Sequence, residues 1–489
     1  MSKSIVRRFA AIFGSNMVTI VAAFLATPVI VRLLGTSEYG NYAFMLSILS
    51  TLILFANAGI FDGIRKYLKE SNREEEWSEQ VFGFYSRLGL GLAVITVLGT
   101  VALVETGVIR RYLGATFELY FLLVALIVGT QQAFSISRGS LMGFDREDVS
   151  EKLMIANRLL AIGVGLVLLW SGYGVAGLLA GKLIANAVTA VIGLFVLRRF
   201  IDLSGVVSGG ADDFPRRSLI TFNVMTTVLF VLFISIKHAD VILIQSFYGS
   251  TQTAYYKAAL NLAEFVWFVP RMVQTALLHS TSELWSEDRH QAITNISSRV
   301  TRYSLLFTVL LVIGLGALAE PTVNVYYGEG YQRAVLPLIV LLPGTVGFAV
   351  ARPILAIGQG KGAFRYLIFA TGGAATLNLV LNLLLIPRFG IVGAAIATSI
   401  GYFSMMIFHV AGARAIGFNP IADLRLPNVL TTFVVAAGAI SFLAALVDSI
   451  LWSLIIVPPV GFLLYSGIAI AAGAISLDEL QELRDQVRV

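Results

Sequence analysis

The sequence predicts an all-α polytopic membrane protein with about 14 transmembrane helices, and three observations predict it. First, 57% of the 489 residues are hydrophobic and only 13% are charged, with a mean hydropathy of +0.83. Second, apolar runs of roughly 18–25 residues recur, the length that crosses ~30 Å of hydrocarbon. Third, basic residues gather in alternate loops. A water-soluble protein of this composition would expose large apolar patches and aggregate.

The apolar runs predict helices rather than barrel strands, because membrane strands are segments of about 10 residues with alternating polarity. The run at 254–278 is more polar than the others. In chain order, we expect spans near residues 9–33, 39–61, 81–104, 117–137, 153–170, 174–197, 219–237, 254–278, 303–320, 334–351, 364–386, 390–411, 428–447 and 452–475.

The basic residues predict the orientation of these spans. With these boundaries, 24 of the 35 Lys and Arg fall on the side of the N-terminus and 5 on the opposite side. Arg302 and Arg352 are among the 24. Positive residues stay in the cytoplasm. We therefore expect a multi-pass cell (plasma) membrane protein with both termini cytoplasmic. The first span is too long for a signal-peptide core, so we expect it to be retained.

The two halves of the sequence resemble each other, which predicts an internal repeat. Residues 29–42 match 243–256 at an offset of 214, and Arg138 falls on Arg352 at the same offset. Residues 172–177 match 388–393 at an offset of 216. We expect an N-lobe at 1–203 with six spans, a cytoplasmic linker at 204–217 and a C-lobe at 218–416 with six spans. The last two helices and a cytoplasmic tail occupy 417–489.

Polar residues within the apolar spans predict where the function lies, because a charge at mid-bilayer costs about 2.5–3.5 kcal/mol. A stripe along 254–278 faces a cavity or, alternatively, locks the helix bundle together. Six residues at spacings of three and four form it: Lys257, Asn261, Glu264, Phe268, Arg271 and Thr275. Four further residues are candidates to line the same space: Asn16, Asn57, Lys237 and Asp240. The two asparagines could equally form inter-helix hydrogen bonds, and Lys237 and Asp240 could equally lie at the outer interface with their side chains reaching the surface.

Other chemistry is not indicated by the sequence. No cysteine is present, and the four histidines show no metal-ligand spacing, so we expect neither a metal site nor a cofactor. No nucleophile triad or carboxylate pair suggests an enzyme. The net charge of +6 follows the topology, so we expect no nucleic-acid partner. Arg158 and Lys182 lie within spans 5 and 6, where Arg158 could reach the cytoplasmic edge.

The N-terminal segment resembles the polysaccharide transporter (Wzx-like oligosaccharide flippase) family of the MATE/MOP flippase superfamily. The likeness rests on Phe13-Gly-Ser-Asn-Met and on the run from Pro28 through Arg32-Leu-Leu-Gly35-Thr-Ser-Glu-Tyr-Gly40 to Tyr42. Gly174-Val-Ala-Gly177 and Gly390-Ile-Val-Gly393 also resemble that family's repeated pattern. The resemblance covers residues 1–416 and leaves a two-helix tail.

This resemblance implies a V-shaped, two-lobed transporter of lipid-linked oligosaccharide, working by alternating access between the leaflets. It implies a cationic central cavity, with arginines on the first and on the seventh or eighth spans. Here Lys257 and Arg271 lie in the eighth span, but the first span has no arginine before Arg32. The implied partners are a polyprenyl-(pyro)phosphate-linked glycan, membrane lipids, and glycosyltransferases or a polymerase of the same pathway.

Two alternative functions remain open from the sequence. A multidrug or cation exporter of the same superfamily would need acidic residues deep in the N-lobe, and spans 1–6 contain none at mid-depth. A membrane-embedded glycan polymerase or ligase would usually have a large outer loop, whereas the predicted outer loops are short.

Overall fold

A computed structural model describes residues 3–70, 75–203, 214–479 and 481, without the side chains of 3–16, 75, 276, 278–280, 282 and 283. The described residues form helices and no strand, which confirms the predicted all-α membrane fold. The chain divides into two compact units, 1–234 and 235–489, and the division falls inside one long helix. Most of the predicted linker, residues 204–213, lies outside the described part.

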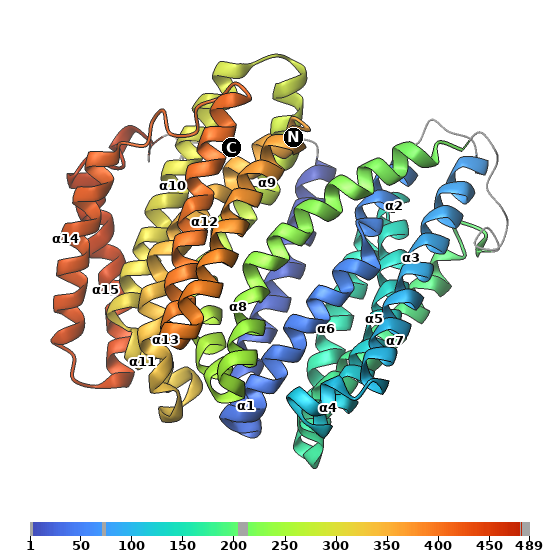
Figure 1. The fold of residues 1–489 in the computed structure, drawn as a ribbon. Coiled ribbons are helices and arrows are strands. Elements are labelled where there is room, and N and C mark those ends of the chain that lie inside the picture. Colours follow the sequence, from blue (N-terminus) through green and yellow to red (C-terminus); the bar gives the residue numbers. More distant parts are fainter. Residues whose placement is uncertain (1–2, 71–74, 204–213, 480, 482–489) are drawn as a thin grey trace. The chain divides into compact units, whose positions relative to one another are not determined.

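Unit 1 is built from helices that run side by side (Figure 1). Ile60, Phe82 and Tyr85 belong to its buried core. Its elements are α1 (Lys3–Asn57), α2 (Ile60–Lys69), α3 (Glu75–Glu105), α4 (Val108–Leu113), α5 (Ala115–Gly143), α6 (Glu147–Leu168), η1 (Leu169–Tyr173), α7 (Gly174–Leu197) and the first part of α8 (Arg216–Phe265).

Unit 2 contains the rest of α8 and the C-terminal helices. Ile293, Ile354 and Val457 belong to one buried core, which joins the last two helices to the rest of the unit. Its further elements are α9 (Phe268–Ser286), α10 (His290–Ala317), α11 (Ala319–Tyr327), η3 (Glu329–Ala334), α12 (Val335–Gly360), α13 (Phe364–Ala415), α14 (Leu426–Ala445) and α15 (Ile450–Ala471).

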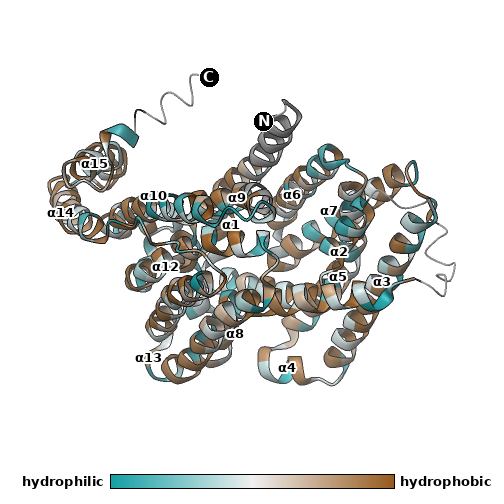
Figure 2. Cartoon of the chain, turned by 90° about the horizontal axis from the view of Figure 1, so that it is seen from above, coloured by the Kyte–Doolittle hydropathy of each residue, from teal (hydrophilic) through white to brown (hydrophobic). Residues whose placement is uncertain are grey.

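Hydrophobic residues make up much of the length of the helices (Figure 2). Ile95, Trp170 and Leu463 are among the large hydrophobic residues that are exposed. Such a surface is unfavourable in water and favourable in hydrocarbon, where the helices satisfy their own backbone groups. Ten helical stretches of the described chain are long and apolar enough to cross a membrane. The chain is therefore a multi-pass membrane protein.

Four of these ten stretches are 41, 51, 50 and 52 residues long. At 1.5 Å per residue, 50 residues rise ~75 Å, more than two membrane thicknesses. Each long stretch is interrupted at a glycine with positive φ: Gly35, Gly172, Gly249 or Gly390. Division there would produce the fourteen spans that the sequence predicts, and the number itself remains a prediction.

The backbone dihedral angles at these interruptions show the internal repeat as well. Gly35 has φ 72° and ψ 175°, and Gly249, 214 residues later, has φ 74° and ψ −174°. Gly174 has φ 54° and ψ −136°, and Gly390, 216 residues later, has φ 58° and ψ −136°. The two halves therefore share their chain reversals at the positions where the sequence matches.

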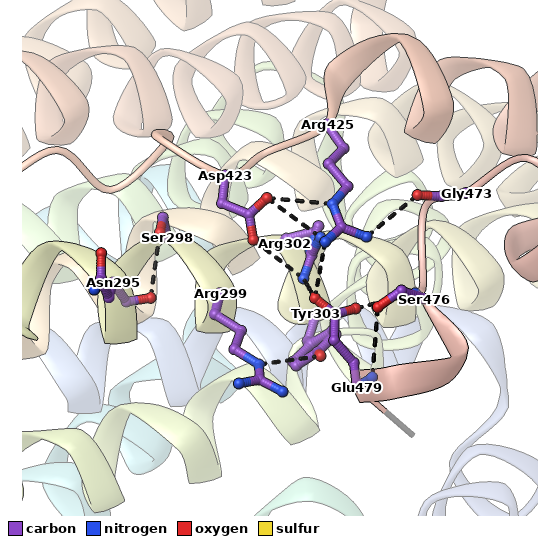
Figure 3. A network of polar contacts seen from close by, with 10 residues as sticks. All are labelled: Asn295, Ser298, Arg299, Arg302, Tyr303, Asp423, Arg425, Gly473, Ser476 and Glu479. Atoms are coloured by element: carbon purple, nitrogen blue, oxygen red, sulfur yellow. Dashed lines mark hydrogen bonds and ion pairs between the residues drawn. The ribbon is translucent and has the colours of Figure 1, made fainter. Parts of the chain in front are cut away.

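Charged side chains also attach the last two helices to α10 (Figure 3). Arg302 pairs with Glu479 and, at 3.2 Å, with Asp423. Arg425 pairs with the same carboxylates, at 3.2 Å from Asp423 and 3.0 Å from Glu479. The network links α10 to the segments before α14 and after α15. The assignment of Arg302 to a loop is wrong, because α10 begins at His290 and the Arg302 side chain is fully buried.

Candidate functional site

The polar segment predicted as one span at 254–278 is divided between two helices. α8 ends at Phe265 and α9 begins at Phe268. A turn joins them, in which the Trp267 backbone N–H donates to the Glu264 carbonyl at 3.1 Å. Lys257, Asn261 and Glu264 are therefore on α8, whereas Phe268, Arg271 and Thr275 are on α9.

The reversal in α8 brings two predicted site residues together. Lys237 precedes Gly249 and Glu264 follows it, yet Lys237 Nζ lies 3.6 Å from Glu264 Oε1. Both side chains are partly buried, with 29% and 23% of their surfaces exposed. An ion pair within a membrane span offsets the cost of placing either charge there alone. The pair is therefore a fixed feature of unit 2.

Further cations surround this pair. The charges of Lys257 and Arg352 act on Glu264. Arg271, which is exposed on α9, acts on both Lys237 and Arg352. Three of these cations thus act on one carboxylate, and Arg271 acts on two of those three, so the site carries an excess of positive charge. Asn261 is half-buried on the same segment of α8.

Arg352 is a site residue that the predicted span at 334–351 leaves out. It lies inside α12, not in a loop, and donates from Nη1 to Gln274 Oε1 at 3.1 Å. Its guanidinium is 4.5 Å from the centre of the Phe348 ring. Hydropathy ended the span too early at 351, whereas the repeat already paired Arg352 with Arg138. Arg138 similarly donates to the Ser150 hydroxyl at 3.2 Å.

Aromatic side chains order the cations. The Trp267 ring centre is 5.2 Å from Lys237 Nζ and 5.9 Å from the Arg352 guanidinium. Trp267 also packs on Phe348 and Tyr402, with ring centres 4.2 Å and 5.2 Å apart. Contacts of cations with aromatic faces hold the charges in place without neutralising them. In the described chain, the buried Trp267 Nε1 and Tyr402 hydroxyl have no hydrogen-bond partner.

Asp240 belongs to a fully buried network next to these cations, and the charge of Lys257 acts on it. Its carboxylate accepts hydrogen bonds from the Tyr256 hydroxyl, from the Thr398 hydroxyl at 3.2 Å and from the Val241 backbone N–H at 2.7 Å. Asn378 Nδ2 donates to Thr398 at 3.3 Å. These three donors satisfy the hydrogen-bonding capacity of the Asp240 carboxylate and hold it in one position. Within the described residues, no group of three His, Asp or Glu could hold a metal ion.

The candidate residues of unit 1 are placed differently. Asn57 Nδ2 donates to the Ser135 hydroxyl at 2.7 Å, so Asn57 ties the end of α1 to α5. The side chain of Asn16 lies outside the described part of the chain. A role of Asn57 or Asn16 in substrate binding stays a prediction.

Solved structures of two membrane transporters have a fold similar to that of this chain. The fold is similar to that of the lipid II flippase MurJ in an inward closed conformation, with TM-score 0.71 and 15% identity over 95% of this chain and 98% of that chain. An inward-facing MATE multidrug resistance transporter of the MOP superfamily is also similar, with TM-score 0.68 and 16% identity over 81% of this chain and 94% of that chain. The chain thus shares the fold of these two transporters.

The family follows from the sequence comparison. The chain belongs to the polysaccharide biosynthesis protein family, which matches residues 29–336. A similar protein is the probable low-salt glycan biosynthesis flippase of Haloferax volcanii, 24% identical over 459 residues, or 91% of this chain and 92% of that protein. The succinoglycan biosynthesis transport protein of Rhizobium meliloti is also similar, with 26% identity over 73% of this chain and 71% of that protein.

Proposed function

We propose that the chain is a lipid-linked oligosaccharide flippase. It moves a polyprenyl-(pyro)phosphate-linked glycan from the cytoplasmic to the outer leaflet by alternating access, for cell-surface polysaccharide or glycoprotein biosynthesis. The observation that carries the proposal is the excess of positive charge around Glu264, on which Lys237, Lys257 and Arg352 act. The printed functions of the Haloferax and Rhizobium relatives support it.

The chemistry of the substrate fits this charge. A diphosphate head group brings negative charge and several acceptor oxygens, and arginine binds such groups through two parallel N–H donors. Lysine contributes a compact point charge. Inside a membrane these contacts are stronger than in water, because fewer solvent dipoles screen them. The glycan itself needs only polar partners such as Asn261 and Gln274.

The alternative of a cation exporter is disfavoured by the same charges. A cationic drug would meet four cations, Lys237, Lys257, Arg271 and Arg352, against two carboxylates, Glu264 and the already hydrogen-bonded Asp240. Like charges brought together at low dielectric repel each other by several kcal/mol in order of magnitude. A glycan polymerase or ligase would need a catalytic acid or base at the site, and Glu264 is already paired with Lys237.

The membrane, the orientation of the chain and the enzymes of its pathway complete this function. The chain works in the cell membrane with both termini in the cytoplasm, as the distribution of its basic residues indicates. Its N-lobe (1–203) and C-lobe (218–416), which the linker (204–217) joins, rock against each other during transport. The C-terminal pair (417–489) shares a buried core with helices of the C-lobe. Glycosyltransferases of the same pathway supply the substrate, and a polymerase or ligase consumes it.

Deletion of the gene tests the function. Completed lipid-linked oligosaccharide should accumulate on the cytoplasmic leaflet while surface glycan is lost, and the intact gene should restore it. Normal surface glycan together with altered tolerance to cationic drugs would instead support the exporter. Loss of glycan polymers with normal outer-leaflet lipid-linked units would support the polymerase.

A further inference from the structure

The internal repeat places a charged site of unit 1 where unit 2 has the Asp240 network. At the offset of 214, Asp240 and Tyr256 correspond to Ala26 and Tyr42. At the offset of 216, Thr398 corresponds to Lys182. The carboxylate of unit 2 is therefore absent from the equivalent place in unit 1, and a cation has been gained there. The tyrosine is kept in both.

A second cation of unit 1 interacts electrostatically with Lys182. The residue is Arg158, and at the offset of 216 its counterpart is the buried Ala374. The charge of Arg158 acts on both Lys182 and Tyr42. Unit 1 thus has two interacting cations and a tyrosine in this region, whereas unit 2 has a carboxylate that is hydrogen-bonded to two hydroxyl groups.

Both cations are at positions that share a side of their helix with buried residues. Residues seven apart share a face of an α-helix, because seven residues make almost two turns. Lys182 is seven residues from Val175 and from Thr189, which are both fully buried. Arg158 is seven residues from the buried Glu151 and Gly165. The two residues therefore lie on the sides of their helices that include buried positions, while the Arg158 side chain is exposed and that of Lys182 half-buried.

The pairing of α6 with α7 fixes the two cations in register. Asn157 Nδ2 donates to Asn186 Oδ1 at 2.8 Å and to Thr189 Oγ1 at 3.0 Å. A Cβ atom added at Gly181 would lie 2.5 Å from the Gly165 backbone nitrogen. Because the helices pack this closely, Arg158 and Lys182 have little freedom to move apart.

The pair has no counter-charge in the described part of unit 1. No ion pair joins Arg158 or Lys182 to a carboxylate there. The polar Asn378 and Asn382 of unit 2 correspond to Ile162 and Leu166, which are apolar. Two neighbouring cations within a membrane span are unfavourable unless an anion joins them.

We infer that Arg158, Lys182 and Tyr42 form a phosphate-binding subsite of unit 1, an inference that rests on the proposed flippase function. The guanidinium and ammonium groups bind phosphate oxygens, and the Tyr42 hydroxyl donates a further hydrogen bond. The phosphate group is carried either by the polyprenyl-linked substrate or by an anionic membrane phospholipid.

The test measures binding of farnesyl diphosphate, a short polyprenyl diphosphate, to the purified full chain in phosphatidylcholine nanodiscs. The starting protein carries Arg352→Gln, which weakens binding of the probe to the cations of unit 2. In that background, adding Arg158→Gln and Lys182→Gln should lower the affinity by about tenfold or more. Equal affinity with and without the two changes would overturn the inference. Lys182→Arg should retain binding, and Arg198→Gln at the exposed end of α7 is the matched control.

Thermal unfolding separates loss of binding from loss of the fold. Farnesyl diphosphate should raise the midpoint of the Arg352→Gln variant and leave that of the triple variant unchanged. The triple variant should still unfold cooperatively without ligand, since removal of two like charges relieves repulsion. A midpoint that rises equally in both proteins would contradict the subsite.

Competition identifies the source of the phosphate. If phosphatidylglycerol in the nanodisc displaces the probe, the subsite holds a membrane phospholipid. If only inorganic pyrophosphate displaces it, the subsite holds the substrate head group. Failure of all three compounds to bind through Arg158 and Lys182 overturns the inference. Binding needs no turnover, so an inactive wild-type protein would contradict the flippase function alone.

Discussion

Arg302 and Glu479 form an ion pair that joins α10 to the segment after α15, 177 residues further along the chain. The Arg302 side chain is fully buried, and Glu479 is 12% exposed. Both residues also contact the pair formed by Asp423 and Arg425 (Figure 3). The position of the last two helices therefore depends on a buried guanidinium.

Glu479→Gln should destabilise unit 2 by about 2 kcal/mol, because it removes one of the two carboxylates that balance the buried Arg302. The remaining carboxylate, Asp423, prevents a larger loss. Thermal unfolding of the purified protein in detergent measures the change. Asp148→Asn, at a surface ion pair in which Asp148 is 57% exposed, should change the midpoint little. Equal midpoints for the wild type and Glu479→Gln would contradict the proposed anchoring.

The same network should make stability depend on acid pH. Burial raises the pKa of Glu479, but the Ser476 backbone N–H and the guanidinium groups of Arg302 and Arg425 outweigh it and lower the pKa from 4.5 to about 2. A lowered folded-state pKa means that the stabilisation is complete above pH ~4.5 and is lost as the pH falls towards ~2. The difference in midpoint between the wild type and Glu479→Gln should therefore shrink over this range. A difference that is constant from pH 6 to pH 3 would show that the charge of Glu479 is not responsible.

Arg352→Gln should reduce transport by about tenfold to hundredfold, since a hydrogen bond to a charged group contributes ~1.5–3 kcal/mol. Arg271→Ala should also abolish export while the protein remains in the membrane. Surface glycan in a deletion strain that carries each variant reports the loss. Arg414→Gln, an exposed cation at the end of α13, is the matched control. Normal surface glycan with Arg352→Gln would exclude this residue from the site.

Gly249→Ala should destabilise the protein by about 1–3 kcal/mol, because its φ of 74° and ψ of −174° lie in a region that residues with a Cβ rarely adopt. The equivalent Gly35→Ala should have the same effect on unit 1. Gly91→Ala is the control, because Gly91 lies within α3 with open space around it. Alanine there should be neutral or slightly stabilising. If Gly249→Ala and Gly91→Ala unfolded at the same temperature, the reversal would not need glycine.

Much of the fold could be predicted because its causes are local or periodic. Run length predicts membrane helices, and the matches around Gly35 and Gly249 predicted the repeat that their dihedral angles now share. The turn at Val266 and Trp267 could not be predicted, because the polar spacing continues through it without a break. Helix propensity alone does not indicate where tertiary packing interrupts a helix.

The site was predictable only in part, because contacts distant in sequence decide it. Lys237 and Glu264 were both candidates, but only the reversal at Gly249 brings them to 3.6 Å. Arg302 followed the loop pattern of basic residues, and its partners Asp423 and Glu479 lie 121 and 177 residues away. Composition cannot distinguish such a buried arginine from one that only sets topology.

Transport in liposomes tests the central proposal most directly. The purified protein is reconstituted into phosphatidylcholine vesicles that contain a fluorescent polyprenyl-diphosphate-linked oligosaccharide, and a membrane-impermeant quencher reports the fraction in the outer leaflet. The wild type should move the lipid between leaflets faster than protein-free vesicles, and Arg352→Gln should be at least about tenfold slower. Movement no faster than in protein-free vesicles, with a protein that still unfolds cooperatively, would contradict the flippase function.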